Sequence, residues 1–132
     1  MNARLLALVG ALLISASPLL KAHHSFAAEY DSNKPVTVTG VVTKVEWTNP
    51  HIWFYVDVKD EQGKVTNWGF SAGPPGVLQR RGISRDVMKK GDVIVVEGFR
   101  ARDGSNNASG GRVTFADGRS VFTASNEDRA PR

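Results

Sequence analysis

The sequence predicts an all-β domain over residues 36–123, a small Greek-key barrel that resembles an OB-fold. Runs rich in β-branched and aromatic residues recur along this region and are separated by turn residues. One or two short helical segments stand between the third and fourth runs, which is the element order of an OB-fold. A generic β-sandwich is the alternative, because periodicity predicts strands better than it predicts their pairing.

Residues 1–22 precede this domain and have the pattern of a secretory signal peptide. Arg4 supplies a basic start, an uncharged apolar run follows, and Ala22 is a small residue at the expected cleavage site. The run is short for a spanning helix, which needs about 20 apolar residues, so a retained anchor ranks second. We therefore expect a periplasmic or secreted protein that begins at His23 and has no membrane span after cleavage.

The first predicted elements of the mature chain are an extended arm and two strands. Residues 23–35 show no clear period and form the expected arm, and residues 36–47 form a β-branched strand in which Gly40 marks a bulge or bend. The second strand follows Asn49-Pro50 and alternates strictly, which places four side chains in the core: Ile52, Phe54, Val56 and Val58. The other face of that strand then carries His51, Trp53, Tyr55 and Asp57.

The third strand and the helical segments follow. Residues 65–71 read as a strand in which Trp68 and Phe70 share one side. Pro74 and Pro75 can begin a short helix that Gly82 ends, and a second helical turn is expected over residues 84–91.

The remaining residues complete the predicted sheet. Residues 92–99 are almost continuously apolar, which indicates a strand buried on both faces, and residues 100–111 form a polar loop. Residues 112–122 read as a hairpin whose Asp117-Gly118 pair suits a type I′ turn. Residues 124–132 are polar, and we expect a disordered tail there.

Several segments together resemble a known family of small exported bacterial proteins that is catalogued only as a domain of unknown function. The resemblance rests on a His-His-Ser-Phe start to the mature chain, an Asn-Pro-His strand motif and two later segments: AHHSFAAEYD, GVVTKVEWTNPHIWFYVDV, GDVIVVEG and DGRSVF. It covers nearly all of the mature chain. The resemblance implies export and cleavage before His23, and it implies no particular activity.

The three histidines of the chain are the first candidate site. An N-terminal His23 can chelate copper through its α-amine and its own Nδ1. A further imidazole from His51 would complete a three-nitrogen site, and His24, which is next to His23 in the sequence, could add another ligand. Glu29 and Asp31 could add an oxygen ligand. In the alternative interpretation, the doublet is a polar start to the arm and His51 bonds a backbone carbonyl.

Aromatic residues around the second and third strands form the second candidate site. OB-folds bind oligonucleotides and oligosaccharides on this surface, and aromatic rings there act as stacking platforms. The predicted ligand-binding residues are Trp47, Trp53, Tyr55 and Trp68. The alternative is that the N-terminal arm or a helix covers these rings and makes them a minor core.

Nucleic-acid binding and enzymatic activity are not expected. Cleavage of the signal peptide lowers the formal net charge from +4 to +2, which is too little for a basic nucleic-acid groove. The sequence has no phosphate-binding loop, nucleophile motif or zinc-protease motif, so no catalytic residue is assigned. We expect an exported binding or accessory module that binds copper, or else a metal-free module with an envelope protein, saccharide or other small ligand as its partner. A copper oxidase is a distant third.

Overall fold

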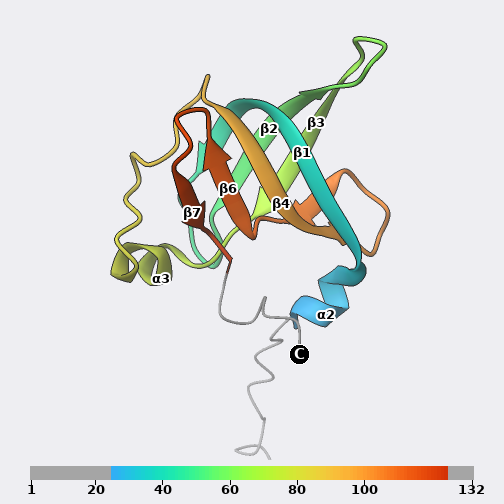
Figure 1. Ribbon diagram of the computed structural model, residues 1–132. Coiled ribbons are helices and arrows are strands. Elements are labelled where there is room, and N and C mark those ends of the chain that lie inside the picture. The colour runs from blue at the N-terminus through green and yellow to red at the C-terminus, as the bar shows by residue number, and fades with distance from the viewer. Residues whose placement is uncertain (1–24, 125–132) are drawn as a thin grey trace, which may run out of the picture.

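Five strands close into a barrel in the computed structural model, which describes residues 25–124 (Figure 1). Two short helices, α2 (Phe26–Glu29) and α3 (Pro75–Arg80), accompany the strands. The strands in chain order are β1 (Tyr30–Glu46), β2 (Trp53–Lys59), β3 (Val65–Ser71), β4 (Val93–Ala101), β5 (Asn107–Ser109), β6 (Arg112–Phe115) and β7 (Ser120–Phe122). The predicted signal peptide and both residues of the histidine doublet lie outside the described residues.

The strand pairing confirms the predicted OB-like barrel. β1, β2 and β3 form an antiparallel meander, β5 pairs in parallel with β3, and β4 pairs antiparallel with both β5 and β1. The β1–β4 pairing closes the ring, and α3 connects β3 to β4 as in an OB-fold. β6 continues along β4 beyond β5, and β7 pairs with β6.

β1 can serve two partners because it is long and bends between them. It pairs with β4 from Pro35 to Val41 and with β2 from Val41 to Glu46. At the changeover, a Cβ atom on Gly40 would overlap the carbonyl of Asp57, so only glycine fits this close approach. The register shift itself falls between Val42 and Lys44, a few residues after the predicted position.

The barrel interior is filled by one face of each strand. In β2 and the residue before it, Ile52, Phe54 and Val56 are buried as predicted, and the next residue on this face, Val58, is partly buried against them. Further buried side chains come from other strands and from the helical connection: Val42, Phe70, Leu78, Ile83, Met88, Ile94, Val96, Ala108, Val113 and Phe115.

Two predictions about the later strands are wrong. β4 is buried on one face only, because Ile94 and Val96 point inward while Val93 is 49% exposed. The polar loop is shorter than expected, since β4 runs on to Ala101 and Asn107–Ser109 forms β5. Such a short strand, with only Ala108 entering the core, has no sequence period to reveal it.

The structure adds detail at both ends of the predicted domain and corrects the hairpin turn. Residues 26–29 form α2 and residues 30–35 already belong to β1, so these parts of the predicted arm are ordered elements. Ala124, predicted to begin the tail, is 2% exposed and bonds through its N–H to Gly111. Gly118 has a φ of 86°, but no non-glycine residue from 25 to 124 has positive φ, which excludes a type I′ turn at Asp117.

Candidate functional site

His51 lies just before β2, and its ring is held in one orientation. Its Nδ1 lies 2.9 Å from the carbonyl oxygen of Ala72, so Nδ1 carries the proton and donates this hydrogen bond. The backbone segments that carry His51 and Ala72 are also hydrogen-bonded to each other, since the Ala72 N–H donates to the Ile52 carbonyl at 2.7 Å. Nε2 has no hydrogen-bond partner among residues 25–124 and is the nitrogen available to a ligand.

The N-terminal segment is attached to the same stretch of chain that holds His51. The Tyr30 hydroxyl lies 2.5 Å from the hydroxyl of Ser71, the residue that precedes Ala72. Tyr30 is buried and directly follows α2. Ser25, the first described residue, follows His24 in the sequence, so the histidine doublet joins the barrel through this anchored segment.

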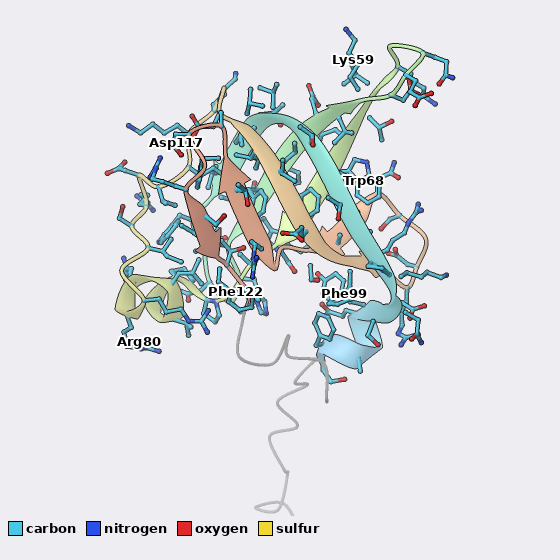
Figure 2. All side chains as sticks on the ribbon, viewed as in Figure 1. Lys59, Trp68, Arg80, Phe99, Asp117 and Phe122 are labelled. Atoms are coloured by element: carbon cyan, nitrogen blue, oxygen red, sulfur yellow. The ribbon has the colours of Figure 1, made fainter. Side chains whose placement is uncertain are left out.

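α2 packs on the outside of the barrel through aromatic contacts. The ring of Phe26 lies 5.3 Å from the ring of Tyr30 and 5.9 Å, edge to face, from the ring of Phe99 on β4. Figure 2 shows Phe99 beside α2. These three rings form a small second cluster outside the main core, against β4 and not over the aromatic rings of the second and third strands, where the alternative interpretation placed the arm.

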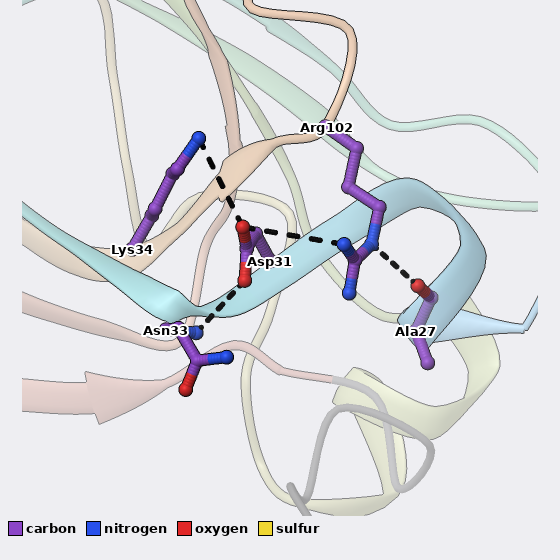
Figure 3. Close-up of polar contacts among 5 residues, drawn as sticks. All are labelled: Ala27, Asp31, Asn33, Lys34 and Arg102. Carbon is purple, nitrogen blue, oxygen red and sulfur yellow. Dashed lines mark hydrogen bonds and ion pairs between the residues drawn. The ribbon is translucent and has the colours of Figure 1, made fainter.

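A complete metal site is not formed by the described residues alone. Within residues 25–124, no three side chains of the His, Cys, Asp or Glu type come close enough to hold a metal ion. Asp31, a candidate oxygen ligand, accepts a hydrogen bond of 3.0 Å from the Asn33 N–H and lies 3.9 Å from Lys34 and 4.0 Å from Arg102 (Figure 3). A metal site that used His51 would need further ligands from outside residues 25–124.

The four predicted ligand-binding aromatic residues do not share a face. Trp68 pairs directly with Val56, which is fully buried, so its ring lies on the core side of β3, 6.2 Å from the ring of Phe70. Trp47 also packs against the core. Trp53 and Tyr55 lie on the outer face with ring centroids 6.4 Å apart. The prediction of one aromatic platform is therefore wrong for Trp47 and Trp68.

A polar network that was not predicted from the sequence borders Trp53 and Tyr55 on the outer face. The Tyr55 hydroxyl donates to Glu46 at 3.2 Å, Lys44 forms an ion pair with Glu46, and Lys44 Nζ lies 5.7 Å from the Tyr55 ring centroid. Burial, and then the hydrogen bond to Glu46, raise the pKa of Tyr55, while the hydrogen bond from Lys44 lowers the pKa of Glu46. Only the β1–β2 register after the bulge places these side chains together.

Within residues 25–124, the fold and this geometry define an OB-like barrel with a docked N-terminal segment and one oriented histidine. The chain belongs to a family of unknown function (DUF6152), whose model matches residues 11–111. This membership confirms the resemblance noted from the sequence. No curated protein matches the chain significantly.

A helix needs about 20 mostly apolar residues to span a membrane. Between residues 25 and 124, neither α2 nor α3 is long and apolar enough to cross a bilayer.

Proposed function

We propose that the mature protein is an exported envelope module that binds copper(II) through His23, His51 and His24. In this proposal residues 1–22 are a signal peptide, and its removal creates the α-amine at His23. That amine and the imidazole of the same residue form a chelate, and the Nε2 atom of His51 adds a nitrogen. The location is periplasmic or secreted.

The observation that carries this proposal is the orientation of His51. Histidines that bind metals usually donate their second ring N–H to a carbonyl or carboxylate, which fixes the tautomer and strengthens the ligand nitrogen. The 2.9 Å bond from Nδ1 to the Ala72 carbonyl is of this kind and leaves Nε2 for the metal. The titration of His51→Ala described below distinguishes this ligand role from a purely structural one.

The position of the N-terminal segment supports the proposal independently. Tyr30 is held to Ser71 and His51 is held to Ala72, so two adjacent residues of the chain hold His51 and the segment that follows the histidine doublet in the sequence. This reduces the loop entropy that would otherwise oppose bringing distant ligands to one ion. Imidazole and amine nitrogens suit copper(II), which should be bound more tightly than zinc by the same ligands.

The test compares three proteins titrated with copper(II) by calorimetry and electron paramagnetic resonance: the mature chain, a form with one residue added before His23, and His51→Ala. An added residue displaces the chelating amine, so it should lower the affinity strongly. His51→Ala should remove one nitrogen from the spectrum. Equal affinities and spectra for all three proteins would reject the proposal. Intact mass of the exported protein checks where cleavage occurs.

A second candidate is a metal-free module that binds a saccharide or an envelope protein on the outer face of β2. The half-buried pair Trp53 and Tyr55, bordered by the Lys44–Glu46 ion pair, is the observation that favours it. Saccharides typically stack on aromatic rings while charged and amide groups bond their hydroxyls. Trp53→Ala should then abolish the retention of the folded protein on immobilised envelope polysaccharide, and unchanged retention would reject this candidate.

A further inference from the structure

The outer face of β1, β4, β6 and β7 carries a row of four paired residues. These strands lie side by side across the front of the barrel in Figure 1. Thr37 pairs with Glu97, and Glu97 pairs with Arg112. Arg112 in turn pairs with Phe122. Paired residues of adjacent strands point to the same side of a sheet, and all four are exposed, so the row lies on the outer face.

The two charged residues at the centre of the row, Glu97 and Arg112, are not paired with each other. Within residues 25–124, no ion pair or hydrogen bond joins the side chain of either residue to another group. Both side chains are exposed and are therefore accessible to a second molecule. A surface that presents one anion directly beside one cation becomes complementary to itself when it is turned through 180°.

Apolar side chains gather on the same face. Four large hydrophobic side chains are exposed between residues 25 and 124, and three of them lie here, with Val41 42%, Val93 49% and Phe122 46% exposed. Val41 pairs with Val93, and each is four residues along its strand from Thr37 or Glu97, which places it on the same side of the sheet. Exposed apolar side chains that cluster on one face are typical of a protein–protein contact.

A groove of about 350 Å³ runs beside the row. Arg112 and Phe122 line it on the side of β6 and β7, and Pro35 and Thr37 line it on the side of β1. The ring of Phe99, on β4, is between them. A groove with these walls can accept an aromatic side chain from a partner, the type of residue that most often anchors an interface.

We propose that this face is a dimer interface, on which a second copy of the chain packs about a two-fold axis between Glu97 and Arg112. The axis reverses the row. Glu97 then lies opposite the partner subunit's Arg112, and the β1 side of the groove, at Thr37, receives the partner subunit's Phe122. The same patch serves both subunits in a dimer of this symmetry, so it needs both signs of charge. The ion pairs fix the register, and apolar burial supplies most of the affinity.

The charges favour a second copy over other partners. Nucleic acids and anionic membrane surfaces attract patches of positive charge, whereas here Glu97 stands beside the cation. A partner of one net charge would leave either Glu97 or Arg112 opposite a like charge. Two ion pairs form at once when the patch meets itself. The inference does not depend on the copper proposal.

The test measures the oligomeric state of the mature chain by analytical ultracentrifugation over a range of concentrations. A chelator is present, so that no metal ion bridges two copies. Glu97→Arg or Arg112→Glu alone places like charges opposite each other twice and should weaken the dimer about a hundredfold. The double reversal exchanges the charges and should restore the dimer. An equimolar mixture of the two single variants should also associate, because one carries two cations at these positions and the other two anions.

Two matched controls lie away from this face. Glu61→Arg reverses an exposed charge in the loop between β2 and β3 and should leave the dimer unchanged. Phe122→Ala removes the apolar anchor and should weaken the dimer about tenfold or more. Val65→Ala, which shortens an exposed side chain on β3, should have no effect. Far-UV circular dichroism and thermal melts verify that each variant is folded.

The outcomes decide the proposal in either direction. Loss of the dimer in both single reversals, with recovery in the double variant and in the mixture, supports the interface. A chain that stays monomeric at millimolar concentration overturns it. A dimer that survives both single reversals and Phe122→Ala uses another surface and also overturns it. If Glu61→Arg weakens the dimer as much as Glu97→Arg, the effect is general electrostatics and the proposal fails.

Discussion

Replacing Trp68 by alanine tests the most consequential difference between the predicted and observed surfaces. The indole lies on the core side of β3, paired with the buried Val56 and stacked on Phe70. The guanidinium of Arg100 lies 5.4 Å from its ring centroid. A ring in this position contributes to stability through burial, whereas a ring on an open platform would contribute mainly to ligand binding.

The expected loss of stability follows from these contacts. Tryptophan-to-alanine changes in cores cost about 3–5 kcal/mol, and the partial exposure of Trp68 places it at the low end, about 3 kcal/mol. The lost cation–π contact with Arg100 is included in that figure. Water reaching the buried Nε of Arg100, which has no hydrogen-bond partner in the described structure, offsets part of the loss. Trp53→Ala is the control and should cost about 1 kcal/mol, mainly the stacking with Tyr55.

The assay is urea unfolding followed by far-UV circular dichroism, because each substitution removes one of the three tryptophans and would alter the fluorescence. In a thermal melt followed by the same signal, a loss of about 3 kcal/mol should lower Tm by roughly 15 °C in a domain of this size. If Trp68→Ala is no more destabilising than Trp53→Ala, the ring does not contribute as a core residue and the β3 assignment of faces is wrong.

Three further predictions follow from single contacts. Gly98→Ala should destabilise the barrel by about 3 kcal/mol, because the added Cβ would overlap the Ser109 carbonyl, while Gly76→Ala in α3 should be tolerated in the same melt. Glu46→Gln should lower the pKa of Tyr55 toward its ordinary value, since the carboxylate disfavours the phenolate; an absorbance titration that shows no change would contradict this. In the proposed copper site, affinity should fall at acid pH, because protons compete with the metal for the ligand nitrogens, and calorimetry at several pH values measures it.

The sequence alone determined the elements whose pattern is local. The strict alternation from Ile52 to Val58 predicted β2 and its core face, and the bounds predicted for β3 are those observed. α3 begins at Pro75, and Gly82, with a φ of 79°, follows its end as expected. Proline and glycine act through their own backbone geometry, and alternation acts between near neighbours, so neither requires knowledge of the rest of the chain.

For the candidate site, the sequence singled out His51 but could not choose its partner. The carbonyl that orients it belongs to Ala72, which is 21 residues away, and the two meet only because β2 and β3 pair. The hydrogen bond from Arg102 to the Ala27 carbonyl of α2 joins residues that are even further apart in the sequence, with a separation of 75 residues. Contacts of this kind leave no periodic trace in the sequence.

Tertiary structure alone decided which aromatic rings are covered. The alternation of side chains along a strand predicts that Trp68 and Phe70 share a side. It does not predict which side faces the core or which residue of β2 is paired with Trp68. The pairing of Val56 with Trp68 settles this, and it depends on the β2–β3 register. β5 likewise exists because β3 and β4 offer unpaired backbone groups on either side of Asn107–Ser109. A three-residue segment with one buried apolar side chain, Ala108, and one buried polar side chain, Ser109, becomes a strand through its neighbours' hydrogen bonds, since its own residues carry too little hydrophobic pattern to specify one.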